Sequence, residues 1–227
     1  MGIYIIFIIF ALISFLVQKT LQHKFETYSK IPIPNGLTGH DIAEKMLKDN
    51  GIYDVKVLSV EGRLTDHYNP QTHTVNLSPD VYYGNNIAAA AVAAHECGHA
   101  VQHAQAYSFL NMRSKLVPFV SFASQWMTWV LLAGILTLKV FPQLMLFGII
   151  LFGVTTLFSF ITLPVEINAS RRALAWLTNA GVTNAYTHDK AQDALRWAAY
   201  TYVVAALSSL ATLIYYILIF VGGRRND

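Results

Sequence analysis

The stretch Ile87–His103, IAAAAVAAHECGHAVQH, places an H-E-x-x-H pattern inside an alanine-rich run without proline. Alanine is the strongest helix former, so the stretch is predicted to be helical. Residues four apart lie on one face of a helix, which lets His95 and His99 present two imidazoles to one metal ion. Glu96 lies beside them, where its carboxylate can reach a metal-bound water. Zinc peptidases use this arrangement, and the helical context argues against a chance match.

The composition of the chain is that of a membrane protein. Apolar residues make up 54% of it and charged residues only 13%, whereas ordinary soluble domains carry about 25% charged residues. The net charge is +3 with no dense block of Lys and Arg, so nucleic-acid binding has little support. The single cysteine, Cys97, excludes an intrachain disulfide framework and is expected to pack in the core.

Four apolar runs are predicted to cross the membrane as helices. The first is slightly short for a span, which tilt can accommodate, and it is interpreted as an uncleaved anchor because no basic residue precedes Lys19. The other three exceed the length needed to cross the hydrocarbon core. The four runs are Gly2–Val17, Leu116–Leu138, Val140–Val165 and Ala198–Val221.

The polar segment between the first two spans predicts a small folded domain. Thr38 can N-cap a helix over Gly39–Asp49, and Gly51 can end it. Tyr53–Val60 is rich in valine and predicts a strand, and the Asn69-Pro70 turn predicts a hairpin. The fold class is therefore a mainly α multi-pass membrane protein with four transmembrane helices and a small α+β, zincin-like domain that carries the H-E-x-x-H helix.

A catalytic zinc normally has three protein ligands, so the two histidines need a partner. The metzincin pattern would require histidine at position 105, which is Gln105 here. Glu166 is the one glutamate after Glu96, and two membrane crossings would return it to the side of His99. Pro164 is predicted to begin a new helix that carries it. If Glu166 were not the ligand, the remaining candidates would be Asp189, Asp193, His188 and His103.

The chain is expected to divide into five parts. They are an anchor helix at 1–17, the zincin-like domain at 18–115, a transmembrane hairpin at 116–165, a third-ligand helix and loop at 166–197, and a last transmembrane helix with its tail at 198–227. The polar segments on the side of the histidines hold 13 of the 16 basic residues. Because basic residues favour the cytoplasmic side, the active site is expected to face the cytoplasm.

Several motifs resemble known membrane peptidases. The H-E-x-x-H helix, two intervening spans and Glu166-Ile-Asn-Ala-Ser170 resemble the membrane gluzincins of the HtpX plan. The chain is more closely similar to the YugP-type neutral zinc metallopeptidases in Gly62–Pro70 (GRLTDHYNP), Leu77–Pro79, Ala93–His103 and Thr201-Tyr202. The resemblance implies a multi-pass zinc protease with His95, His99 and Glu166 as metal ligands and Glu96 as catalytic base. Ser170 stands where the wider HtpX-like pattern has Asp, so another group is expected to orient the histidines.

The expected function is therefore that of a cell-membrane zinc endopeptidase. A zinc-activated water would hydrolyse peptide bonds with Glu96 as the general base. Its partners would be a membrane or membrane-proximal polypeptide substrate and the lipid bilayer, with Zn²⁺ as cofactor. The alternative is a non-catalytic membrane zinc-binding scaffold or regulatory protein. A transporter is disfavoured because the predicted spans contain almost no ionisable residues.

Overall fold

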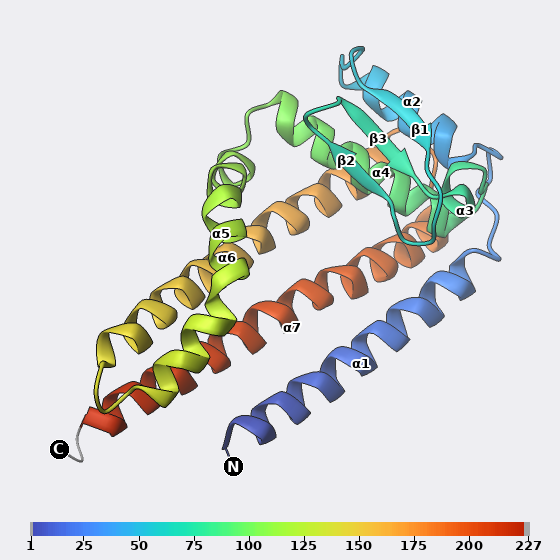
Figure 1. The fold of residues 1–227 in the computed structure, drawn as a ribbon. Coiled ribbons are helices and arrows are strands. Elements are labelled where there is room, and N and C mark those ends of the chain that lie inside the picture. The colour runs from blue at the N-terminus through green and yellow to red at the C-terminus, as the bar shows by residue number, and fades with distance from the viewer. Residues whose placement is uncertain (1, 225–227) are drawn as a thin grey trace. The chain divides into compact units, whose positions relative to one another are not determined.

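A computed structural model describes residues 2–224 of the chain (Figure 1). Met1 and residues 225–227, which belong to the predicted anchor and tail, lie outside the described residues. The described elements, in chain order, are α1 (Gly2–Tyr28), α2 (Gly39–Asp49), β1 (Lys56–Ser59), β2 (His67–Asn69), β3 (Thr74–Leu77), α3 (Pro79–Tyr82), α4 (Ile87–Ala104), α5 (Ser108–Leu136), α6 (Pro142–Asn179) and α7 (Ala185–Arg224).

Four of the described helices are long and apolar enough to cross a membrane, as the sequence predicted: α1, α5, α6 and α7. Each begins or ends well beyond the apolar run that identified it. Helix α7, for example, begins at Ala185 and not near Ala198, because its first three turns are polar but contain no helix breaker. The apolar runs therefore located the spans but not the ends of the helices.

The expectation that Pro164 begins a new helix is wrong. Pro164 lies inside α6, which runs without a break from Pro142 to Asn179. Proline lacks an N–H, so one backbone hydrogen bond is lost at this turn, but long apolar helices tolerate a proline where neighbouring groups satisfy the freed carbonyl. Glu166 is therefore held by a continuous helix of 38 residues and not by a separate short one.

The described chain forms two compact units, and the candidate site lies entirely in one of them. This unit comprises Val17–Leu110 and Pro164–Tyr200. The other comprises the chain up to Leu16, Asn111–Leu163 and the chain from Thr201 onward. The five-part division expected from the sequence stays a prediction.

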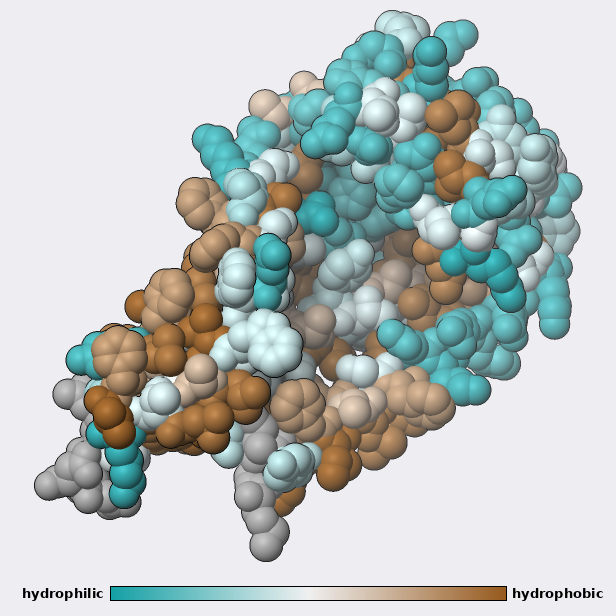
Figure 2. Space-filling model, in the orientation of Figure 1, coloured by the Kyte–Doolittle hydropathy of each residue, from teal (hydrophilic) through white to brown (hydrophobic). Residues whose placement is uncertain are grey.

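The first of these units contains a three-stranded sheet beside α4, with strand order β1-β3-β2. β2 and β3 pair antiparallel, with Tyr68 opposite Val75, which confirms the predicted hairpin. β1 pairs parallel with β3, and β2 is left at an edge of the sheet. Figure 2 shows mainly hydrophilic residues over the sheet and α2.

Helices α2 and α4 form the core of this unit. Thr38 caps α2 as predicted, accepting from the Asp41 N–H while the Asp41 carboxylate accepts from the Thr38 N–H, a capping box. The buried alanines from Ala88 to Ala100 have small side chains, so neighbouring elements pack closely against most of the surface of α4. Cys97 is fully buried, as expected, and its Sγ lies 3.5 Å from the Ala43 carbonyl of α2.

The other unit is made of the apolar parts of the long helices. Leu131, Met145 and Ile149 form its small buried cluster. Gly134 lets α5 and α6 approach closely, since a Cβ there would lie 2.6 Å from the Met145 Cα. Many of its large apolar side chains are exposed, Trp129 among them at 68%, and Figure 2 shows this surface as hydrophobic. Such a surface suits contact with lipid.

Candidate metal centre

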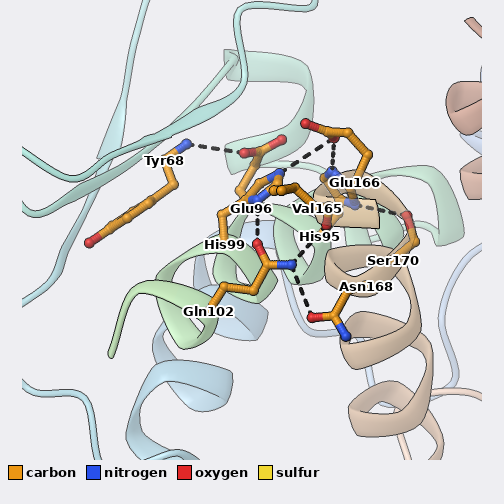
Figure 3. A network of polar contacts seen from close by, with 9 residues as sticks. All are labelled: Tyr68, His95, Glu96, His99, Gln102, Val165, Glu166, Asn168 and Ser170. Carbon is orange, nitrogen blue, oxygen red and sulfur yellow. Dashed lines mark hydrogen bonds and ion pairs between the residues drawn. The ribbon is translucent and has the colours of Figure 1, made fainter. Parts of the chain in front are cut away.

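Helix α4 brings the two histidines of the motif together. Asn86 caps it, its side chain accepting from the Ala89 N–H at 2.9 Å, and the helix then runs through the whole motif to Ala104. The rings of His95 and His99 lie 4.8 Å apart between centroids, on one face and one turn apart. The predicted helix and its histidine face are therefore present (Figure 3).

Glu166 of α6 completes a group of three possible ligands. Its Oε2 lies 3.3 Å from His95 Nε2 and 3.5 Å from His99 Nε2. One ligand atom from each residue lies within 4.8 Å of the others, and within the described chain these are the residues grouped in this way. Zinc bonds of about 2.0–2.2 Å in a tetrahedron would separate neighbouring ligand atoms by about 3.4 Å. Both the spacing and the donor types therefore fit a zinc ion.

The group is shielded from water. The Glu166 side chain is only 6% exposed, and those of His95 and His99 are 14% and 12% exposed. Burial alone would lower the pKa of His99, but its hydrogen bond with Glu166 and the nearby carboxylate charges outweigh it and raise that pKa. A proton and a cation would therefore compete for His99 Nε2.

Glu96 lies at the free edge of the sheet. Its Oε2 accepts a hydrogen bond from the Tyr68 N–H of β2 at 3.1 Å (Figure 3). In an antiparallel pair, alternate residues direct their N–H groups away from the partner strand, and Tyr68 uses this outward N–H for Glu96. The carboxylate is buried beside the histidines but outside the group of three ligand atoms.

Two side chains orient the histidines from behind, and the sequence analysis missed both roles. His95 Nδ1 lies 3.1 Å from Ser170 Oγ, and His99 Nδ1 lies 3.0 Å from Gln102 Oε1. Ser170 itself thus contacts the histidine, although it stands where a carboxylate was expected. The spacing contains the signal that could have identified Gln102, because it follows His99 by three residues on the same helix.

Gly98 permits the close approach of α4 and α6. A Cβ at this position would lie 2.6 Å from the carbonyl oxygen of Ala169, closer than any side chain could pack. The glycine inside the motif therefore allows the helix of the histidines to contact the helix of Glu166 directly.

The alternative ligands have other contacts. His103 Nδ1 lies 3.1 Å from the Tyr68 hydroxyl, and His188 Nδ1 lies 2.9 Å from Thr178 Oγ1. Asp193 forms an ion pair with Lys24 at 2.8 Å, and Asp189 lines the polar cavity beside that pair. The structure thus groups Glu166, and none of these four, with the histidines.

Comparisons with known proteins agree with this geometry. The model of the family described as "Putative neutral zinc metallopeptidase" matches residues 3–221. The chain is 43% identical over 215 residues to a Bacillus subtilis (strain 168) protein named "Putative membrane protease YugP", with 95% of each chain covered. No solved structure matches. With a match over nearly its whole length, the chain belongs to this family of neutral zinc metallopeptidases.

Proposed function

We propose that the chain is a membrane-bound, zinc-dependent endopeptidase of the gluzincin type. His95, His99 and Glu166 would hold the zinc ion, and Glu96 would act as general base. The observation that carries this proposal is the meeting of both Nε2 atoms and the Glu166 carboxylate beside Glu96. Structural zinc sites are usually closed by four protein ligands, whereas three ligands and a neighbouring base suit catalysis.

Each group of the site would have its own role in the hydrolysis. Bound zinc supplies Lewis acidity for the peptide carbonyl and lowers the pKa of water. The Tyr68 N–H holds Glu96 Oε2, which leaves Oε1 to take the proton of the attacking water. Glu96 would then pass this proton to the amine that leaves. The burial of the site would keep competing water away from both transfers.

Strand β2 is the surface on which we expect an extended substrate to bind. It lies at an edge of the sheet, and an added strand could form hydrogen bonds with the outward main-chain groups that Glu96 leaves free. Since Tyr68 of this strand contacts Glu96, a peptide on the edge would pass beside the base. The four apolar helices favour a membrane or membrane-proximal polypeptide as substrate, and the charge bias favours a cytoplasmic site.

Glu96→Gln tests the mechanism, because the amide keeps the size of the side chain but cannot take up a proton. We expect the full-length variant in detergent to keep one zinc per chain and to lose cleavage of fluorescein-labelled casein by more than about a hundredfold. Glu61→Gln, an exposed glutamate outside the site, is the control and should leave cleavage unchanged. A Glu96→Gln protein that binds zinc and still cleaves at the wild-type rate would refute the mechanism.

The same experiment examines the alternative function. A zinc-binding scaffold has no need for a general base, so wild type and Glu96→Gln would bind zinc equally and neither would cleave. Loss of cleavage specific to Glu96→Gln would exclude the scaffold.

A further inference from the structure

We propose that Gln102 is a positioning residue that fixes which ring nitrogen of His99 faces the metal and ties this choice to the helix of Glu166. The inference rests on the proposed zinc site. Gln102 has no exposed surface, and Figure 3 shows its amide between His99 on one side and Val165 and Asn168 on the other. All of its polar contacts are thus made inside the protein.

The amide of Gln102 can have only one orientation. Its Nε2 lies 2.8 Å from the Val165 carbonyl oxygen, which can accept a hydrogen bond but never donate one. The NH₂ group must therefore face Val165. The opposite end of the amide, Oε1, must then face His99 at 3.0 Å.

A second chain of contacts imposes the same orientation. Gln102 Nε2 also lies 3.0 Å from Asn168 Oδ1, which accepts from Arg172 Nε at 2.7 Å. A guanidinium can only donate, so the Asn168 atom must be the oxygen. A flipped Gln102 would bring its own oxygen against two acceptor oxygens. Arg172 is held in turn by Gln105 Oε1, 2.7 Å from its Nη1.

The orientation of the amide determines the tautomer of His99. Because Gln102 presents an oxygen, His99 Nδ1 must carry a hydrogen and donate it. The unprotonated nitrogen of the neutral ring is then Nε2, the atom that faces Glu166 at 3.5 Å. The groups behind a ligating histidine generally set its tautomer in this way. Here the donor and acceptor roles are fixed along the contacts that run from Gln102 through Asn168 to Arg172.

Two substitutions separate this role from simple packing. Gln102→Met keeps the length but removes the acceptor, and we expect zinc to bind about 10–100 times more weakly. Gln102→Glu keeps an oxygen for His99 Nδ1–H, although its second oxygen would face the two acceptor oxygens, so its zinc affinity is expected to lie between those of wild type and Gln102→Met. If Gln102 only linked the two helices, both variants would lose affinity alike. Gln192→Met, at an exposed site on α7, is the control.

The measurements are zinc affinity of the full-length protein by competition with a chelator, and ¹⁵N NMR of its labelled histidines with zinc bound. Wild type should show His99 protonated at Nδ1. Equal zinc affinity of wild type and Gln102→Met, or coordination through Nδ1, would overturn the inference. Should Gln102→Met not fold, the wild-type NMR spectrum decides. A wild-type protein that binds no zinc would instead refute the proposed function.

Discussion

His95 and His99 lie one turn apart on the same helix, yet they are oriented by different kinds of group. Behind His99 is the Gln102 amide, whose orientation is imposed by a backbone carbonyl and, through Asn168, by Arg172. Behind His95 is the Ser170 hydroxyl, which can rotate and either donate or accept. The heavy atoms therefore determine the tautomer of one histidine and leave that of the other to the metal. These two supports, Gln102 behind His99 and Ser170 behind His95, both depend on the contact between α4 and α6.

The largest effect is expected where both supports are lost together. Gly98→Ala would place a Cβ 2.6 Å from the Ala169 carbonyl oxygen, so α4 and α6 would have to separate. We expect loss of zinc binding and a loss of about 2 kcal/mol in the free energy of unfolding. Thermal melting and metal analysis of the purified protein measure the two effects.

Gly153→Ala is the matched control for this prediction. It also lies in a long helix, but a Cβ there meets nothing within 4 Å. Alanine is the better helix former, so this variant should be neutral or slightly more stable. Zinc binding by Gly98→Ala at the level of Gly153→Ala would contradict the close packing of the two helices.

Lowering the pH should have the next largest effect on zinc binding, because it protonates His99. The pKa of this histidine is raised above 6.5, chiefly by Glu166 against the effect of burial. A proton on Nε2 excludes the metal. As the pH is lowered, zinc affinity should therefore begin to decrease while the pH is still above 6.5, and then decrease by about tenfold per pH unit for each competing proton. Competition titrations at pH 8, 7 and 6 measure this. A dissociation constant that stays the same from pH 8 to 6 would contradict it.

The smallest effect on zinc affinity is expected for substitution of Ser170, which lies behind His95. Ser170→Ala removes a hydroxyl that orients the ring without fixing its tautomer, so zinc should bind only a few-fold more weakly, less than for Gln102→Met. Ser170→Asp supplies the carboxylate of the wider family pattern and should bind zinc at least as tightly as wild type. If Ser170→Ala cost more affinity than Gln102→Met, the contrast between the two supports would be wrong.

The sequence located the elements whose signals are local. The capping residue Thr38, the Asn69-Pro70 turn and the alanine run around His95 each depend on neighbouring residues, and the structure contains the predicted helices and hairpin. The short helix Pro79–Tyr82 was missed, because one turn leaves no periodicity to detect. The prediction that a helix begins at Pro164 was wrong because proline is common at helix starts and rare within helices.

The sequence indicated the residues that meet at the candidate site but not the residues that support them. H-E-x-x-H and a single later glutamate indicated His95, His99 and Glu166, and the structure groups them. The parallel pairing of β1 with β3 and the contact of Gln102 with Val165 join segments far apart in the sequence. No local pattern reports such contacts, because they depend on how separate segments of the chain pack together.

Zinc content of the purified, full-length protein tests the central claim most directly, with wild type beside Glu166→Ala and Glu96→Gln. If Glu166 is the third ligand and Glu96 only the base, wild type and Glu96→Gln should each hold one zinc per chain and Glu166→Ala should lose it. Full retention of zinc by Glu166→Ala would contradict the account, because the metal would then be held by residues that the structure does not bring to this site.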